Sequence, residues 1–523
     1  MPALRVLLVI AFGVLMSACA SLPDHVERVE STALAGTEST RLGQALRPQL
    51  AAHPGQSGVY PLGVARDAFA ARILLARAAD RSLDLQYYIW HGDTTGQLLW
   101  QTVWEAAERG VRVRMLLDDA NTGGLDPILA ALDAHPNIQV RLFNPFANRG
   151  FRLANLADFS RLNRRMHNKS FTADNQMTIV GGRNVGDEYY GADLNVGFQD
   201  LDVLAAGPVV QEASAEFDRY WNSEFAYPAA SLLGPPPGDG ATLLNENWQK
   251  VKQDPKARRY ADALRQTPIV VQLAEGRIAM EWTTAQILSD DPDKVRLSPE
   301  RSGLQLSAQL SKVFGNGQRE LDLVSPYFVP GRGGTEALEK IAGRGVKVRV
   351  LTNSLAATDV APVHAGYAKY RKELLTSGVM LYELKPGAAD VTSNSDDHRT
   401  PGVPGSGGSS GSSASSLHAK TFAVDRSRVF VGSFNLDPRS ARINTEMGML
   451  IDSPAMAQRL SGHFDSVIPD HAYQVRLLPD GGGMEWIDRG PSGEARYTSE
   501  PGSGPLQRMW IRFLSILPIE AQL

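Results

Sequence analysis

Two stretches of the chain decide its fold: His167-Asn-Lys-Ser-Phe-Thr-Ala-Asp174 and His418-Ala-Lys-Thr-Phe-Ala-Val-Asp425. Both follow the pattern His-x-Lys-x4-Asp, and in both a Gly-x-x-Asn segment begins after six further residues. The chain has only 10 His and 12 Lys in 523 residues, so two chance matches with identical downstream spacing would be very rare. The sequence therefore contains an internal repeat, which is typical of a duplicated structural unit.

The repeat extends to the predicted secondary structure around both motifs. Each half has a strand, a crossover helix, a second strand that begins Gly-Val and a third strand: 82–89, 95–109, 110–117 and 138–143, then 320–328, 335–344, 345–351 and 379–384. Strands that alternate with helices of this length favour an α/β fold with a mixed, mostly parallel sheet flanked by helices. We therefore expect two pseudo-symmetric halves, packed together with one shared active site.

The composition of the chain and its Pro/Gly-rich and Gly/Ser-rich segments predict how it is divided into parts. A chain of this length with 43% hydrophobic residues can fill two cores. The Pro/Gly-rich residues 233–240 indicate a boundary, and the Gly/Ser-rich residues 401–416 indicate a flexible loop at the mouth of the site. The expected parts are a signal peptide (1–18), a tether (19–56), a first half (57–232), a connection (233–300), a second half (301–475) and a C-terminal membrane-interface segment (476–523).

The N-terminus has the pattern of an export signal. Arg5 precedes an apolar run from Val6 to Met16, which is too short to span a bilayer. The single cysteine of the chain, Cys19, follows this run and resembles the lipidated residue of a bacterial lipobox. We expect a lipid-anchored protein of the bacterial cell envelope, on the periplasmic side of the outer membrane because Ala20 is not Asp. The alternative is an uncleaved membrane anchor with an incidental cysteine.

The residue types of the repeat point to phosphodiester chemistry. Residues two apart on a strand face the same way, so His167 projects with Lys169, and His418 with Lys420. Two lysines can offset charge on the non-bridging phosphate oxygens. One neutral imidazole can attack phosphorus while the other, protonated, donates to the leaving oxygen. No cofactor is required, and the remaining histidines show no shared spacing that suggests a metal site.

Further polar residues are candidates for supporting this pair. Asn184 and Asn435, in the tight turns after the next strand, are candidates for binding phosphate oxygens. An acid should orient each imidazole, and Glu446 and Asp200 are the candidates. Asp200 is preferred to Asp202 because the apolar run after it aligns with the run after Glu446.

These motifs resemble the phospholipase D superfamily with two His-Lys-Asp motifs, and within it the bacterial cardiolipin synthase C type. The resemblance covers most of the chain from about residue 58 and includes residues 87–90, 165–170, 180–184, 432–440 and 517–520. It implies phosphatidyl transfer between phospholipids, with His167 as nucleophile and His418 as acid and base. It also implies that Asp174 and Asp425 are structural. One departure is Gly182 where the second copy has Ser433.

The leading hypothesis is a phosphatidyltransferase that makes cardiolipin from phosphatidylglycerol, with phosphatidylethanolamine as an optional second substrate, through a phosphohistidine. Hydrolysis to phosphatidic acid is the alternative, and a superfamily nuclease and a catalytically silent envelope scaffold rank below it. The net charge of −4 argues against a nucleic-acid partner. Expected partners are phospholipids and a membrane, and we expect a monomer whose two halves form the site.

Two segments are candidates for membrane contact. Residues 509–518 are apolar and carry Trp510 with Arg508 and Arg512 nearby, as in an interfacial helix. A helix docked on the body explains the same pattern. Residues 146–165 mix five arginines with apolar residues, which suits anionic head groups or a solvated amphipathic helix.

Overall fold

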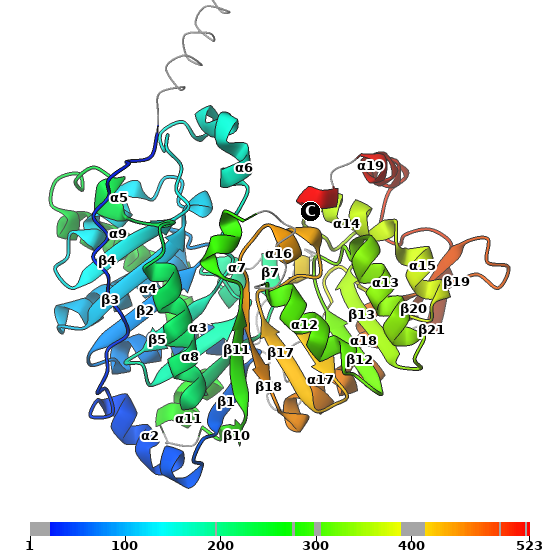
Figure 1. The fold of residues 1–523 in the computed structure, drawn as a ribbon, viewed down its shortest axis with the longest axis horizontal. Coiled ribbons are helices and arrows are strands. Elements are labelled where there is room, and N and C mark those ends of the chain that lie inside the picture. Colours follow the sequence, from blue (N-terminus) through cyan, green and yellow to red (C-terminus); the bar gives the residue numbers. More distant parts are fainter. Residues whose placement is uncertain are drawn as a thin grey trace, which may run out of the picture.

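The structure is a computed structural model that describes residues 21–193, 196–274, 278–297, 305–388, 414–490, 493–517 and 520–523 (Figure 1). The predicted signal peptide, Cys19 and residues 401–413 of the Gly/Ser-rich loop lie outside the described residues. Among the helices in the described ranges, none is long and apolar enough to cross a membrane.

The first half is built on a nine-stranded sheet with the order β10-β1-β8-β6-β5-β2-β3-β4-β9. Its strands are β1 (Ser57–Leu62), β2 (Ser82–Tyr87), β3 (Arg112–Asp118), β4 (Ile138–Phe143), β5 (Ser170–Ala173), β6 (Met177–Gly181), β8 (Asp202–Ala206), β9 (Ala226–Pro228) and β10 (Glu281–Thr283). The accompanying helices are α2 (Arg41–Ala52), α3 (Ala65–Ala78), α4 (Thr94–Glu108), α5 (Asp126–Asp133), η2 (Arg152–Asp158), α6 (Phe159–Leu162), α7 (Asp187–Tyr190), α8 (Pro208–Trp221), α9 (Gly240–Gln253), α10 (Pro255–Arg265) and α11 (Pro268–Ala274).

The second half repeats this plan on a ten-stranded sheet with the order β11-β18-β17-β16-β12-β13-β14-β19-β20-β21. Its strands are β11 (Ala285–Ser289), β12 (Glu320–Val324), β13 (Lys347–Asn353), β14 (Met380–Leu384), β16 (Lys420–Val424), β17 (Arg428–Gly432), β18 (Met447–Ile451), β19 (Ala472–Leu477), β20 (Met484–Gly490) and β21 (Gly493–Tyr497). Its helices include α12 (Leu306–Gly315), α13 (Gly331–Ala342), α14 (Ala361–Ala368), α15 (Arg371–Thr376), α16 (Pro438–Arg442), α17 (Pro454–Ser466), α18 (Ile468–His471), α19 (Pro505–Ile516) and η6 (Glu520–Gln522).

The mixed sheets flanked by helices confirm the predicted fold class, but the expectation that the sheets are mostly parallel is wrong. Only β2-β3-β4 and β12-β13-β14 pair in parallel, and the other pairings in the two large sheets are antiparallel. The motif strands β5 and β16 each enter a hairpin whose turn has two residues at positive φ, Asp174-Asn175 and Asp425-Arg426. Such turns reverse the chain at once, so no crossover helix follows the motif.

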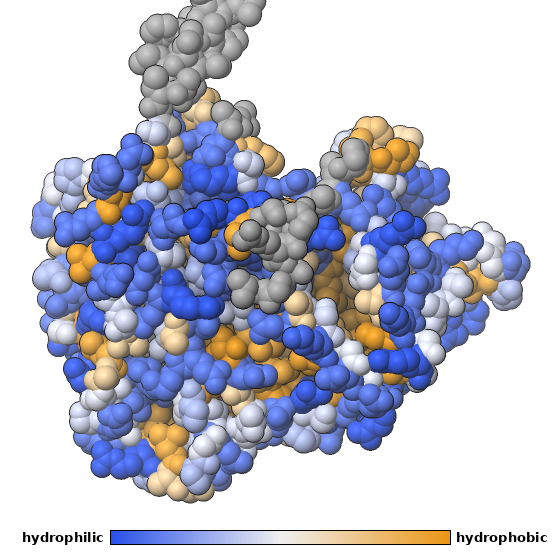
Figure 2. Space-filling view, in the orientation of Figure 1, coloured by the Kyte–Doolittle hydropathy of each residue, from blue (hydrophilic) through white to orange (hydrophobic). Residues whose placement is uncertain are grey.

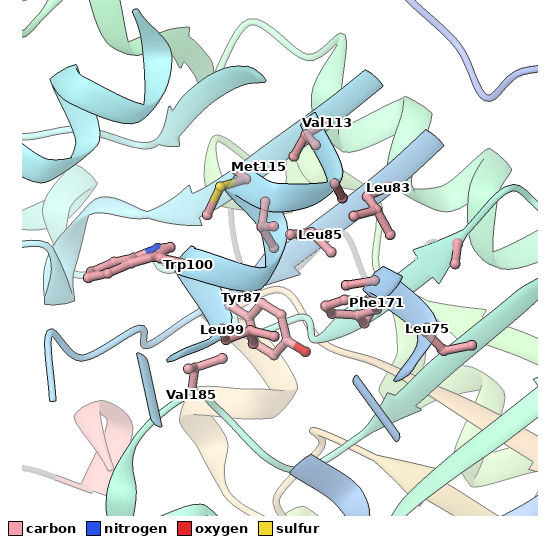
Figure 3. Close-up of a cluster of buried hydrophobic side chains, with 14 of the residues drawn as sticks. Leu75, Leu83, Leu85, Tyr87, Leu99, Trp100, Val113, Met115, Phe171 and Val185 are labelled. Atoms are coloured by element: carbon pink, nitrogen blue, oxygen red, sulfur yellow. The ribbon is translucent and has the colours of Figure 1, made fainter. Parts of the chain in front are cut away.

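The core beneath the first motif holds its strand rigidly. Leu99 and Trp100 of α4 pack against alternate residues of β2 and β3, and Phe171 of β5 joins the same cluster (Figure 3). All of these side chains are almost fully buried. Phe171 therefore anchors β5, the strand that directly follows Lys169, in this core.

A buried ion pair occupies the same place in each half. Arg114 on β3 donates from Nε to Asp84 Oδ1 on β2 over 2.6 Å, and Arg349 on β13 donates from Nη2 to Asp322 Oδ2 on β12 over 2.8 Å. Both arginines are at most 1% exposed. The duplication therefore includes the charges inside the core.

The segments before and between the halves pack against the first half. Arg28 donates to the carbonyls of Glu224 and Ala226, and the amide of Ala33 donates to the Asp218 carboxylate. This part of the expected tether is therefore docked and not loose. In the expected connection, α9 lies against α4 and α5, α11 lies against α3, and β10 and β11 join different sheets.

Candidate active site

The two motifs meet where the halves exchange backbone hydrogen bonds. The amide of His167 donates to the carbonyl of Thr445 over 2.8 Å, and the amide of His418 donates to the carbonyl of Gln199 over 2.8 Å. A short parallel sheet of β7 (Val196–Gln199) and β15 (Ala414–Leu417) adds to the second contact. Each histidine is thus fixed by the opposite half.

The candidate orienting acids are crossed between the halves. His167 Nδ1 lies 2.8 Å from Glu446 Oε2, and His418 Nδ1 lies 2.6 Å from Asp200 Oδ2. Each acid directly follows the residue that bonds the same histidine's backbone. With Nδ1 held by a carboxylate, Nε2 is left for chemistry in both rings.

Both candidate lysines lie beside their histidines. Lys169 Nζ donates to the carbonyl of His167 over 2.5 Å, and Lys420 Nζ lies 2.9 Å from Nδ1 and 3.2 Å from Nε2 of His418. Burial lowers the pKa of Lys169 to about 7 and that of Lys420 to about 8. A bound phosphodiester would add negative charge beside both lysines and would favour their protonated forms.

The electrostatics of the two histidine-acid pairs differ. Burial raises the pKa of Glu446 to about 7, while burial and the nearby lysines lower the pKa of His167 well below its usual value. Although burial opposes it, the charges of His418, Lys420 and Arg183 lower the pKa of Asp200. Burial and the charge of Lys420 lower the pKa of His418 as well, so these shifts do not distinguish the two imidazoles, and the role of His167 as nucleophile stays a prediction.

A steric constraint explains why the first copy has Gly182 where the second copy has Ser433. In the second half, the Ser433 hydroxyl donates to Glu446 and accepts from the amide of Met447. In the first half, a Cβ at Gly182 would lie only 2.2 Å from Asp200 Oδ1. The shorter acid therefore occupies the space that a side chain at position 182 would need.

We expect Gly182→Ala to lower turnover by at least about 100-fold, because the methyl group displaces Asp200 and releases His418. The measurement is phosphodiester turnover alongside thermal unfolding. Gly333→Ala is the matched control, since its Cβ would meet nothing within 4 Å. Full activity of a folded Gly182→Ala protein would contradict this role for the Asp200 position.

The remaining predicted residues fall into two groups. Asn184 and Asn435 are buried next to the motifs, but the Asn184 amide already accepts from the amide of Ile89 and donates to the Tyr189 hydroxyl. Their phosphate-binding role stays a prediction. Asp174 accepts from the amides of residues 80–82, and Asp425 accepts from those of residues 318–320. These bonds tie the motif hairpins to the starts of β2 and β12.

Aromatic residues next to the two histidines complete the site, and the spacing of the His-x-Lys motifs gave no sign of them. The Tyr88 ring meets His167 edge-on at 4.9 Å between centroids, and Tyr189 meets His418 in the same way at 5.2 Å. Phe198 also packs on His418. Tyr88 stands in the Tyr87-Tyr-Ile-Trp90 stretch, whose place directly after the first strand was the available signal.

The five arginines of residues 146–165 all have partners within the protein. Arg149 pairs with Asp119 and Asp126, Arg152 donates to carbonyls of η1 (Asp119–Asn121), Arg161 to Pro145, Arg164 to Lys294 and Leu297, and Arg165 pairs with Asp118. They hold the loop onto the body, because buried carbonyls and carboxylates need donors.

Among the described residues, one group of His, Asp and Glu side chains is close enough together to hold a metal ion. Ligand atoms of His91, Asp93 and Glu188 lie within 4.8 Å of one another. Asp93 already accepts from the amides of Gly96 and Asp187, and the hydrogen bond to Glu188 raises the pKa of His91. A helix cap and an ion pair account for this cluster, and the prediction of a metal-independent site stays a prediction.

Two α/β halves that share one pair of His-Lys motifs define a two-domain enzyme of the phospholipase D type. A family model described as "Cardiolipin synthase, PLD-like domain" matches residues 73–221 and again residues 310–468. The chain belongs to this family.

Comparison with known proteins agrees with this membership. The chain is 46% identical to cardiolipin synthase C of Escherichia coli over 483 residues, which cover 92% of this chain and 99% of that protein. It is 32% identical to an uncharacterised Helicobacter pylori protein over 83% of both chains. The fold matches phosphatidylserine synthase of Haemophilus influenzae with a TM-score of 0.52 and 16% identity, over 83% of this chain and 92% of that one. The resemblance stated from the motifs is confirmed.

Proposed function

We propose that this protein is a phosphatidyltransferase that makes cardiolipin from two molecules of phosphatidylglycerol. The observation that carries the proposal is the pair of buried histidines, each held by an acid from the other half and each beside a lysine. Identity of 46% with a protein named cardiolipin synthase C supports the choice of substrate.

In the first step, His167 Nε2 attacks the phosphorus of one phosphatidylglycerol. The bond from phosphorus to the head-group oxygen breaks, and His418 donates a proton so that glycerol leaves. Lys169 and Lys420 offset the charge on the non-bridging oxygens. The product is a phosphatidyl group bonded to His167.

In the second step, the head-group hydroxyl of another phosphatidylglycerol takes the place of glycerol. His418, now neutral, removes its proton while the oxygen attacks phosphorus. The bond to His167 breaks, and cardiolipin and the free imidazole result. One phosphodiester is exchanged for another, so no nucleotide is required.

Two other reactions use the same four residues. Water as the acceptor would give phosphatidic acid, and the relatives named above favour transfer over that outcome. Nuclease activity is disfavoured by the net charge of −4 and by the presence of only 12 lysines.

The test is incubation of the purified protein with labelled phosphatidylglycerol, with and without phosphatidylethanolamine, followed by lipid separation. We expect cardiolipin and free glycerol, and a larger yield with phosphatidylethanolamine would identify it as a second substrate. Phosphatidic acid as the sole product would refute the synthase proposal.

We expect kcat/KM to fall as pH rises through about 7 to 8, because Lys169 and Lys420 of the free enzyme lose their protons there. Bound phosphate raises the pKa of both lysines, so kcat should hold to higher pH. The measurement is the pH profile of both constants, with thermal unfolding at each pH as the control. A kcat/KM that stays constant up to pH 9 would contradict protonated lysines as the phosphate ligands.

The likeness to cardiolipin synthase C also indicates a membrane-associated bacterial protein. We further propose that Cys19 is lipidated after removal of residues 1–18 and anchors a monomer to the periplasmic side of the outer membrane. Labelling with palmitate should require Cys19. Unchanged labelling of Cys19→Ser would refute the anchor.

A further inference from the structure

Exposed apolar side chains gather on two segments of the surface. Among the described residues, eleven large hydrophobic side chains are exposed, and seven of them belong to α19 or to the stretch that contains η2 and α6. On α19 they are Leu506, Met509, Trp510, Phe513 and Ile516, between 52 and 81% exposed. On the other segment they are Phe151 and Phe159, both more than half exposed. Scattered single residues need no explanation, but such clusters do.

Helix α19 is apolar on two faces. Ile511 and Leu514 are buried against Leu355 and Ala365, which docks the helix on α14. The five exposed residues follow helical spacing and form a separate stripe, which Figure 2 shows as an orange and pale-orange patch. The interpretation as a helix docked on the body is confirmed, and the exposed apolar outer face leaves the interfacial helix a prediction.

The two apolar segments are linked by hydrogen bonds next to the first motif. The chain from α6 runs through Asn163 to His167, and Arg439 of α16 donates to both Oδ1 and the carbonyl of Asn163. Gln522, a few residues after α19, accepts from the Asn163 side chain, and the amide of Arg439 donates to the carbonyl of Leu523. Asn163 and Arg439 thus join the two segments, and Asn163 lies only four residues before His167 in the chain.

The N-terminal side of the chain lies at the same end of the molecule. The described residues begin at Ser21, which is exposed, and the dark-blue start of the described chain lies at the end of Figure 1 that carries α6 and α19. Only Ala20 separates Ser21 from Cys19, and two residues of extended chain span at most about 7 Å. An acyl chain on Cys19 would therefore hold this end of the protein, and not the end with α2 and α11, near the lipid.

We propose that α19 together with Phe151 and Phe159 forms a docking rim that rests on an anionic lipid bilayer, with the active-site mouth facing the membrane. The charge of α19 fits this occupant, because the helix carries Arg508 and Arg512 and no acidic residue. Phosphatidylglycerol can then reach His167 while its acyl chains stay in the bilayer. The role of that lipid as substrate rests on the proposed function, but contact with the bilayer can be measured without turnover.

The first test uses the single cysteine of the chain. Residues 19–523 with Cys19→Ser retain every described residue and contain no cysteine. Phe513→Cys, Phe159→Cys and Val271→Cys then allow labelling of one position at a time with an environment-sensitive fluorophore. Val271 is the matched control, since it is an exposed hydrophobic residue on α11 at the opposite end of the molecule (Figure 1).

On addition of phosphatidylglycerol vesicles, the emission from positions 513 and 159 should shift to shorter wavelength, and that from position 271 should not. Vesicles of phosphatidylcholine should give a smaller shift. An unshifted signal at 513 and 159, or an equal shift at 271, would overturn the docking rim.

The second test changes the rim and leaves the site intact. Trp510→Glu with Phe513→Glu should weaken sedimentation with phosphatidylglycerol vesicles by at least about tenfold, whereas Val271→Glu should not. Turnover of a monomeric short-chain phosphatidylglycerol should be unchanged, so a rim defect is distinguished from a damaged site. If transfer fails in every protein but vesicle binding follows this pattern, the proposed function falls and the docking rim stands. A self-association of the parent protein that the double substitution abolishes would assign the surface to a second copy instead and overturn the proposal.

Discussion

Replacing His167 by alanine is expected to lower phosphatidyl transfer by at least about 10⁴-fold, because the reaction loses its nucleophile. His418→Ala should cause a loss of similar size with natural lipids, since glycerol release needs its proton and acceptor activation needs its neutral ring as the base. The measurement is cardiolipin formation from labelled phosphatidylglycerol. His53→Ala is the control, because His53 stacks on Trp282 and contacts none of the motif residues.

The roles of the two histidines should become distinguishable with a substrate whose leaving group needs no proton. With a p-nitrophenyl ester of phosphatidic acid, His418→Ala should release one equivalent of p-nitrophenol and retain the lipid on the protein. His167→Ala should release none. A burst in His167→Ala with none in His418→Ala would reverse the assigned roles, and substantial turnover of natural lipid by either variant would refute the shared site.

Replacing Arg349 by alanine is expected to destabilise the second half by about 3–5 kcal/mol, because it leaves Asp322 buried and without its partner. Burial already raises the pKa of Asp322 even with the arginine present. The measurement is the free energy of unfolding in urea. The loss should be smaller at low pH, where a protonated Asp322 no longer needs a cation.

Two further variants define this effect. Arg496→Ala removes an exposed ion pair on β21 and should have little effect on the free energy of unfolding. Joint replacement of Arg349 and Asp322 by leucine should recover part of the loss, because no unpaired charge remains in the core. If Arg349→Ala cost no more than Arg496→Ala, the duplicated buried pair would have no structural importance.

Local patterns predicted much of the fold. The crossover units around β2 and β12 follow from strand composition and from helices of suitable length between them. The antiparallel pairings of the other strands could not be predicted from local patterns, because strand direction depends on where a strand pairs and not on its own residues. The Asp174-Asn175 hairpin is a local signal, yet nothing local indicates that β1 inserts between β8 and β10.

The sequence by itself determined the chemistry and the duplication. The spacing of His167 with Lys169 and of His418 with Lys420 is a property of neighbouring residues, so it was found without knowledge of the fold. The expectation that each pair lies on one strand is wrong, because β5 begins at Ser170 and β16 begins at Lys420. Both candidate acids were also found by aligning the two halves.

Only the tertiary structure decided which acid serves which histidine and which face of α19 is exposed. Glu446 bonds His167 and Asp200 bonds His418, because the backbone of each motif pairs with the opposite half. The exposed stripe of α19 depends in the same way on which of its two apolar faces packs on α14. Contacts between distant segments are set by packing of the whole chain, and they cannot be predicted from a pattern of neighbouring residues.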